Sequence, residues 1–227
     1  MSTANDQTIK PILFNTEMVR AILDGKKTQT RRIFKYDTSK EIFAAPGTIS
    51  LENGLESIKI MFQDNTETLV IPQYKINDIL YVRETFYDID DENIVYRADY
   101  PWHWTAIDAV YGDIDTDGEE EWVKWKPSIH MPKKHARIFL KVTNVRGEKL
   151  QDMILYDIIK EGFPFDSNVS PRAMKHIKAT DRLWNEQESS MVQWWIKLWN
   201  STAKDGYKWE DNPLIPIYDF ERILNVV

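Results

Sequence analysis

Apolar and polar residues alternate along several short stretches of the chain, a pattern that predicts half-buried β-strands. The expected strands cover residues 10–14, 29–34, 57–62, 66–71, 79–86, 136–145 and 216–224, with two shorter ones near 94–98 and 122–125. The Asp64-Asn65 pair lies between two of them and is typical of a tight turn, so 57–62 and 66–71 are expected to form a hairpin. Residues 35–54 show no clear period and are expected to be irregular.

Apolar residues three and four positions apart predict three helices. The first covers residues 15–24, and Gly25 takes the left-handed conformation that ends it. The second covers 150–162. The third, 189–202, has the strongest pattern, and its apolar stripe indicates core packing by Met191, Val192, Trp195, Leu198 and Trp199.

Strands with a few interspersed helices, and no regular βαβ alternation, indicate an α+β fold built on a small barrel-like sheet. At 227 residues the chain is expected to be one domain from 8 to 227, after a flexible N-terminal tail at 1–7. Residues 88–121 contain twelve acidic residues and one basic residue, Arg97, and are interpreted as a surface insertion. Within it, 113–118 begins like a calcium loop, but Lys124 occupies the twelfth position, where a glutamate is needed, so we expect a solvated acidic turn.

Composition narrows the possible functions. The formal net charge is −7, which argues against broad binding to duplex nucleic acid but allows a local basic cleft. The absence of cysteine excludes disulfides, thiolate zinc sites and a cysteine nucleophile, and the four histidines lack metal-ligand spacing. We therefore expect no metal and no cofactor. No signal peptide or membrane-spanning run is found, and the expected location is the cytoplasm.

The most unusual segment is 25–32, with two lysines, two threonines and two arginines in eight residues. Cations at the end of a helix complement the helix dipole, but this does not explain arginines that continue into a strand. Strand alternation predicts an inward set and an outward set. The inward set is Lys27, Thr30 and Arg32, and the outward set is Lys26 and Arg31.

A second unusual segment is the loop 125–137. Two prolines bracket Ser128 and His130, and basic residues follow, including Lys134 and Arg137. A stiff loop of this kind suits recognition of a planar or anionic ligand. An ordinary loop with a solvated basic end is an equally good interpretation.

The spacing Gly25-x-Lys27-x-x-Thr30-x-Arg32 resembles the signature of the ASCH family, a branch of the PUA-like fold, whose usual pattern is Gly-x-Lys-x-x-Glu-x-Arg. Larger phage and prophage members are similar over most of the chain, through segments 77–80, 83–84, 96–99, 125–132, 157–162 and 219–222. The resemblance implies a PUA-like small β-barrel with flanking helices, to which about 37–73 and 88–121 are insertions.

Thr30 stands where the family usually has glutamate. A small bacterial ASCH enzyme that deacetylates acetylcytidine also has threonine there, and the resemblance implies a catalytic set of Lys27, Thr30 and Glu161. A threonine hydroxyl needs a base to take its proton, and a lysine with a lowered pKa can serve. Alternatively, Thr30 is an ordinary strand residue and Lys27 a phosphate contact.

The resemblance implies binding of single-stranded RNA, or of a modified nucleoside or nucleotide, in a basic cleft, with hydrolysis of an N-acylated cytidine as an accompanying activity. The expected binding residues are Lys26, Arg31, Arg32, Arg83, Trp125, Ser128, His130, Lys134 and Arg137. Two alternatives remain open. One is a metal-independent ribonuclease using Lys27, Arg32 and His130. The other is a non-enzymatic phage protein that engages a host protein through its acidic segment 88–121.

Overall fold

The structure is a computed structural model that describes residues 9–40, 42–44, 50–52, 55–89, 93–99, 124–164, 179 and 186–224. Several expectations lie outside these residues. They concern the tail at 1–7, the acidic turn at 113–118, most of the acidic insertion and the first half of the strand expected at 122–125.

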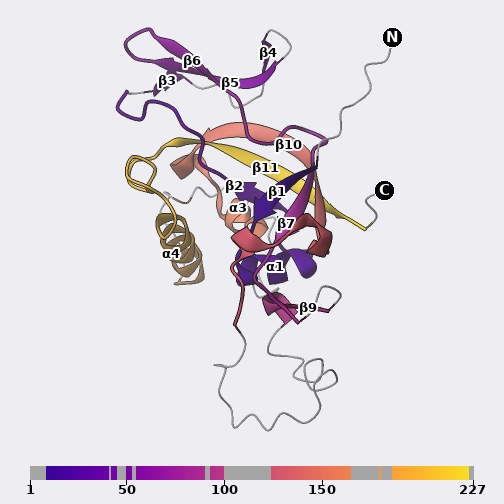
Figure 1. The fold of residues 1–227 in the computed structure, drawn as a ribbon. Helices are drawn as coiled ribbons and strands as arrows, with labels where there is room; N and C mark the ends of the chain where they lie inside the picture. The colour runs from indigo at the N-terminus through magenta and orange to yellow at the C-terminus, as the bar shows by residue number, and fades with distance from the viewer. Residues whose placement is uncertain are drawn as a thin grey trace, which may run out of the picture.

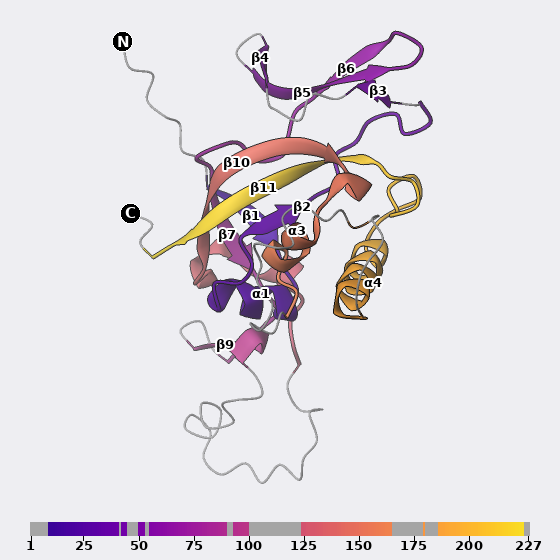
Figure 2. The same ribbon diagram turned by 180° about the vertical axis from the view of Figure 1, so that it is seen from behind.

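A five-stranded mixed sheet forms the centre of the molecule (Figure 1). Its strand order is β1-β7-β10-β11-β2, and the strands are β1 (Ile9–Leu13), β7 (Ile79–Arg83), β10 (Phe139–Lys149), β11 (Leu214–Ile223) and β2 (Gln29–Arg31). The pair β1–β7 is parallel and the other pairs are antiparallel. The two long strands β10 and β11 curve across the whole molecule in both views (Figures 1 and 2).

These elements confirm the α+β class. The sheet is curved but open, because β1 and β2 end its strand order and no ladder joins them within the described residues. β2 is shorter than the expected strand 29–34. Its partner β11 contains Pro216, which has no N–H to donate, and Arg32 N–H contributes one last bond to the Pro216 carbonyl at 3.3 Å.

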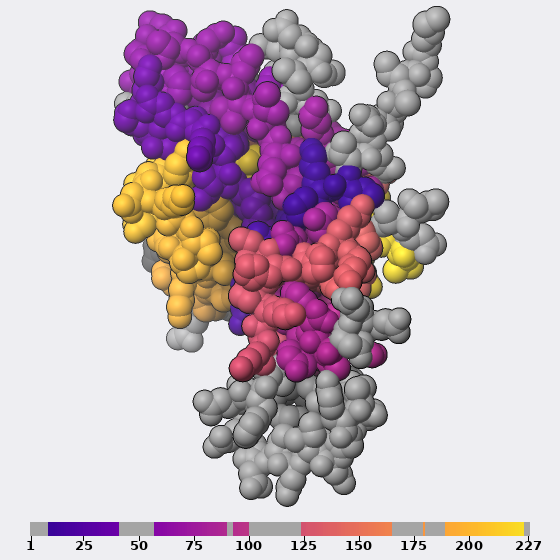
Figure 3. Space-filling view, viewed as in Figure 1, coloured from indigo at the N-terminus to yellow at the C-terminus, as the bar shows by residue number. Residues whose placement is uncertain are grey.

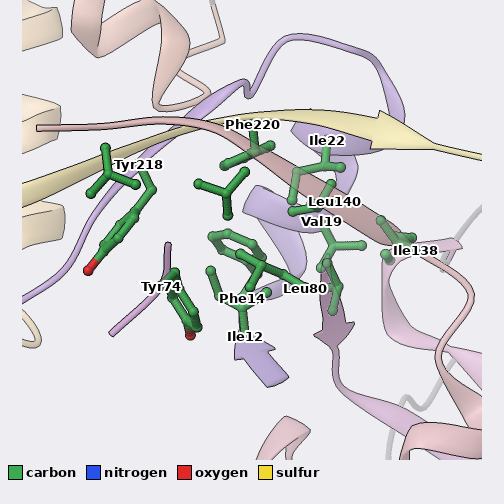
Figure 4. Packing of buried hydrophobic residues seen from close by; sticks show 14 residues of the cluster. Ile12, Phe14, Val19, Ile22, Tyr74, Leu80, Ile138, Leu140, Tyr218 and Phe220 are labelled. Atoms are coloured by element: carbon green, nitrogen blue, oxygen red, sulfur yellow. The ribbon is translucent and has the colours of Figure 1, made fainter. Parts of the chain in front are cut away.

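The main core lies between the sheet and helix α1 (Thr16–Leu23). Asn15 caps this helix, and its side chain accepts a hydrogen bond from Met18 N–H at 2.8 Å. Val19 and Ile22 are buried. Figure 4 shows how the helix residues meet aromatic and aliphatic side chains of the strands and of the segments next to them, among them Ile12, Phe14, Tyr74, Leu80, Ile138, Leu140, Tyr218 and Phe220.

A smaller sheet packs over the outer side of β10 and β11 (Figures 1 and 2). It contains β3 (Ile42–Ala44), β4 (Ser50–Glu52), β5 (Leu55–Phe62) and β6 (Glu67–Val70). The β5–β6 hairpin confirms the prediction, with Asn65 in the left-handed region at φ 62°. The irregular structure expected at 35–54 is wrong at β3 and β4, because short strands held by pairing with β5 need no alternation of their own.

The remaining strands and helices depart in detail from the predictions. The strand expected at 79–86 is divided, since β7 pairs with β10 while β8 (Phe86–Asp88) pairs with β9 (Ile94–Tyr96). The helix expected at 150–162 is a 3₁₀ turn (Leu150–Asp152) followed by α3 (Leu155–Lys160), which starts where Asp157 Oδ2 accepts from Ile154 N–H at 3.3 Å. Other 3₁₀ turns are Arg97–Asp99, Ser128–His130 and Lys133–His135.

Helix α4 (Glu186–Asn200) packs its apolar stripe against α3 and β11, which confirms the core interpretation of Met191, Val192, Trp195 and Trp199. Leu198 is half-buried at the edge of the same core. Among the helices in the described ranges, none combines the length and the apolar character that a membrane crossing demands.

Candidate functional site

The segment 25–32 runs from the end of α1, past the end of α3, into β2. Gly25 has φ 70°, and the amides of Lys26 and Lys27 both donate to the carbonyl of Ala21, at 2.8 and 2.9 Å. Thr28 N–H then donates to the Lys160 carbonyl at 2.9 Å. This path directs the next side chains into the space between α3 and the sheet.

Lys27 is fully buried. Its Nζ donates to Gln29 O, Glu161 O and Glu161 Oε2, each at 2.8 Å, so the three hydrogens of the ammonium group each have an acceptor. Burial lowers the pKa of Lys27, and the Glu161 carboxylate opposes that shift. The carboxylate and the terminal carbonyl of α3 hold the cation in place.

Arg31 completes the pairing of Glu161. Its Nη1 donates to Glu161 Oε1 and Gln29 Oε1 at 3.0 Å, and its Nη2 donates to Asp157 Oδ2 at 3.2 Å. The side chain is 1% exposed. The prediction that Arg31 points outward is wrong, because every residue of β2 is covered, on one face by the core and on the other by α3 and α4.

An outer layer of charges surrounds this pairing. Asp219 accepts from Gln29 Nε2 at 2.8 Å and from Arg146 Nη1 at 2.6 Å, and Arg146 Nε donates to Glu148 at 2.6 Å. We call the whole set the Arg31 cluster. It consists of Lys27, Gln29, Arg31, Arg146, Glu148, Asp157, Glu161 and Asp219.

A pocket of about 180 Å³ opens beside the Arg31 cluster. Thr30, Arg31, Arg32 and Glu161 line its inner side. The other walls are Leu13, Asn15 and Met18 from the β1–α1 region, and Trp195, Leu198, Trp199, Ser201 and Thr202 from α4 and the turn after it. The pocket therefore has two apolar walls and a polar floor.

Thr30 and Arg32 line this pocket together with Arg31, whereas Lys27 lies behind it. Arg32 is half-buried, donates from Nη2 to the Leu13 carbonyl at 2.8 Å, and has its guanidinium carbon 5.0 Å from the centre of the Phe14 ring. Thr30 pairs with Tyr218 through the sheet ladder, and within the described part of the chain its hydroxyl forms no hydrogen bond.

The proposed catalytic set is brought together only in part. Lys27 and Glu161 form a buried ion pair, and both Thr30 and Glu161 line the pocket. Since the Lys27 ammonium hydrogens are all used elsewhere, Lys27 is placed to hold Glu161 and not to contact Thr30 directly.

One predicted binding residue, Arg137, belongs to a separate cluster. Arg137 donates to both oxygens of Glu84 at 2.9 and 3.0 Å and to both oxygens of Asp99 at 2.6 and 3.0 Å, with its guanidinium carbon 3.9 Å from the Tyr96 ring centre. We call these four residues the Arg137 cluster. Burial raises the pKa of Glu84, and hydrogen bonds to two carboxylates raise the pKa of Arg137.

The remaining predicted residues do not line the pocket. Arg83 donates to the carbonyls of Met131 and Ile129, which fixes the turn that displays Ser128 and His130. Residues 124–137 and the α4 region are both visible on the face shown in Figure 3. The other predicted residues outside the pocket lining are Lys26, Lys134 and Trp125. Lys26 pairs with Asp24 at 3.2 Å, Lys134 is exposed, and Trp125 lies beside Arg97.

Trp195 and Trp199 are two pocket residues that the sequence analysis assigned to core packing alone. Trp195 is 2% exposed and Trp199 is 6% exposed, and both belong to the α4 core. Both also line the pocket. Their helical spacing could only indicate a buried face, since the pocket depends on β2 lying opposite. Among the residues that the structure describes, no group of three or more histidine or acidic side chains is placed to hold a metal ion.

Comparisons of the chain with family models, with curated proteins and with solved structures find no match. The function therefore has to be argued from the pocket itself.

Proposed function

We propose that this chain is an ASCH-like protein of PUA-like fold that binds one base of a modified nucleoside, a nucleotide or single-stranded RNA in the pocket at Thr30. The observation that carries the proposal is the lining of that pocket. It combines the Arg32 cation and the Thr30 hydroxyl with the rings of Trp195 and Trp199. The curved β10–β11 pair (Figure 1) and the position of Thr30 and Arg32 at the pocket support the family resemblance.

Shape and chemistry both favour a base. Leu13 and Met18 on one side and Trp195 and Trp199 on the other are apolar walls, and aromatic and apolar side chains of this kind hold the flat faces of bases. Pockets for drug-sized ligands are typically about 300–1,000 Å³. At about 180 Å³ this one has room for a base, and the sugar and phosphate would remain at the mouth, within reach of Arg32.

Nucleotide titration tests the proposal. We expect CMP, UMP, AMP or GMP, or a short single-stranded RNA, to quench tryptophan fluorescence at low salt, with weaker binding as salt is added. Arg32→Gln should weaken binding about tenfold, the loss of one charged contact. Lys134→Gln removes an exposed cation outside the pocket and should bind as wild type. A wild-type protein that responds to none of these ligands would rule out the proposal.

Hydrolysis of an N-acylated cytidine is a second candidate, favoured by the uncommitted hydroxyl of Thr30, which lines the same pocket as Glu161. Thr30 Oγ1 would bond to the acyl carbon while its proton passes through Glu161 to the departing N4 amine. Water would then cleave the acyl-threonine ester, which releases the carboxylic acid and restores the hydroxyl.

Incubation with N4-acetylcytidine separates the two candidates. Release of cytidine by wild type, lost in Thr30→Val, supports hydrolysis. Valine keeps the shape of threonine, so this variant should fold and still bind the nucleoside. If wild type binds acetylcytidine and releases no cytidine, hydrolysis is excluded and the binding function stands.

A further inference from the structure

The indole of Trp195 has a buried donor that the fold does not use. The side chain is 2% exposed, and its Nε1–H has no hydrogen-bond acceptor among the described residues. On the next turn of the same helix, Trp199 Nε1–H donates to the Tyr207 carbonyl at 2.7 Å. Buried tryptophan N–H groups normally find such a partner, because an unmade bond forfeits the solvation of the donor.

The ring that carries this donor is held firmly at the pocket. The Arg31 guanidinium carbon lies 5.7 Å from its centre, the Trp199 ring lies 5.9 Å away and the Trp194 ring 6.5 Å away. Trp195 also lines the pocket between α4 and Thr30. A fixed donor at a binding surface recognises a ligand without having to be ordered first.

The other polar groups around the pocket are largely committed to the protein. Arg31 and Glu161 bind each other, and the hydroxyls of Ser201 and Thr202 donate to the carbonyls of Leu198 and Trp199, at 2.7 and 3.3 Å. The edge of a neutral base would therefore be recognised by the donors that are not bonded within the protein.

We propose that Trp195 is the specificity-determining donor of this pocket, and that its Nε1–H donates to a carbonyl oxygen or an unprotonated ring nitrogen on the edge of the bound base. This inference rests on the proposed function and deepens it, because it selects ligands with an acceptor on the edge that faces α4. A site with a buried donor rejects a ligand that lacks the matching acceptor, since the donor is then left unpaired.

The experiment follows the indole N–H signals by ¹⁵N–¹H NMR while CMP, UMP, AMP and GMP are titrated into the full chain. The Trp195 signal is identified by its loss in Trp195→Phe, which keeps an aromatic ring and removes the donor. Trp194→Phe is the control, because Trp194 packs on Phe163 and does not line the pocket. Near-UV circular dichroism checks that both variants fold.

We expect at least one nucleotide to move the Trp195 signal downfield, and Trp195→Phe to bind it about tenfold more weakly, the loss expected for one hydrogen bond. Trp194→Phe should bind as wild type. If a nucleotide binds but the Trp195 signal stays in place and Trp195→Phe binds equally well, the inference is overturned while the binding function stands. If no nucleotide perturbs any signal, both are overturned.

Discussion

The Arg31 cluster and the Arg137 cluster are built from the same parts and differ in how they are enclosed. In each, an arginine lies between two carboxylates and over an aromatic ring, Trp195 for Arg31 and Tyr96 for Arg137. The side chain of Arg31 is 1% exposed, whereas that of Arg137 is 27% exposed.

Glu161 in the Arg31 cluster also holds buried Lys27, so one carboxylate serves two buried cations. In the Arg137 cluster two carboxylates serve one arginine, and Asp99 is open to water at 44% exposure. The comparison shows that a basic residue in a loop is not available to bind a ligand when carboxylates of the protein already pair with it. Of the two arginines that line the pocket, Arg31 is paired with carboxylates, whereas Arg32 forms no ion pair with the described residues.

The largest difference should appear when one carboxylate is removed from each cluster. Glu161→Gln leaves two buried cations without their shared carboxylate and should lower the free energy of unfolding by about 3–5 kcal/mol. Glu84→Gln should cost about 1 kcal/mol or less, because Arg137 keeps Asp99 and partial solvation. Urea unfolding of both variants measures this, and equal losses would contradict the comparison.

Gly162 probes how tightly the Arg31 cluster is closed. Its φ is +101°, and an added Cβ would lie 2.9 Å from Ala21 Cβ and 3.3 Å from Lys27 Cβ. Gly162→Ala should therefore cost about 2 kcal/mol through backbone strain and crowding combined. Gly25→Ala is the matched control at φ +70°, where an added Cβ meets nothing within 4 Å, and it should cost only about 1 kcal/mol of strain. If thermal unfolding shows a larger loss of stability for Gly25→Ala than for Gly162→Ala, the space around Lys27 can relax.

Arg137→Gln tests whether the Arg137 cluster is structural. It should lower the free energy of unfolding by about 1–2 kcal/mol, the value of charged hydrogen bonds that are partly solvated, and leave nucleotide affinity unchanged. Arg32→Gln should do the reverse, with weaker affinity and nearly unchanged stability. Unfolding and titration of the same two samples give both readouts, and a loss of affinity in Arg137→Gln would make its cluster part of the site.

The smallest effect concerns pH. Burial raises the pKa of Glu84 above its ordinary value of 4.5, so the folded state binds this proton more tightly than the unfolded state does. The stability that this proton contributes is complete below pH 4.5 and is lost as the pH rises through the raised pKa. Relative to Glu84→Gln, wild type should lose some free energy of unfolding between about pH 4 and about pH 7. Unfolding of both proteins at the two pH values measures this change. If wild type and Glu84→Gln differ in free energy of unfolding by the same amount at both pH values, the prediction is contradicted.

Local patterns predicted the elements that have a buried face of their own. Periodicity and turn residues predicted helix α1, the β5–β6 hairpin, β10, β11 and α4. The short strands β3 and β4 could not be found in this way, because three residues held by pairing with a neighbour carry no period.

The candidate site was predictable only where one segment supplies it. Thr30 and Arg32 are two residues apart in one segment, and both line the pocket. The burial of Arg31 was not predictable, since alternation assumes that one face of a strand meets water and β2 is covered on both faces. Trp195 is separated from Arg31 by more than 160 positions in the sequence, and only the packing of α4 brings them together.

The sequence by itself determined the α+β class, the main elements and the unusual charge of segment 25–32, because these depend on residues a few positions apart. Only the tertiary structure decided which cations are paired, which hydroxyl stays uncommitted and which tryptophans line the pocket. These properties depend on distances between side chains from β2, α3 and α4. In a buried environment such distances determine whether each charge or donor has a partner.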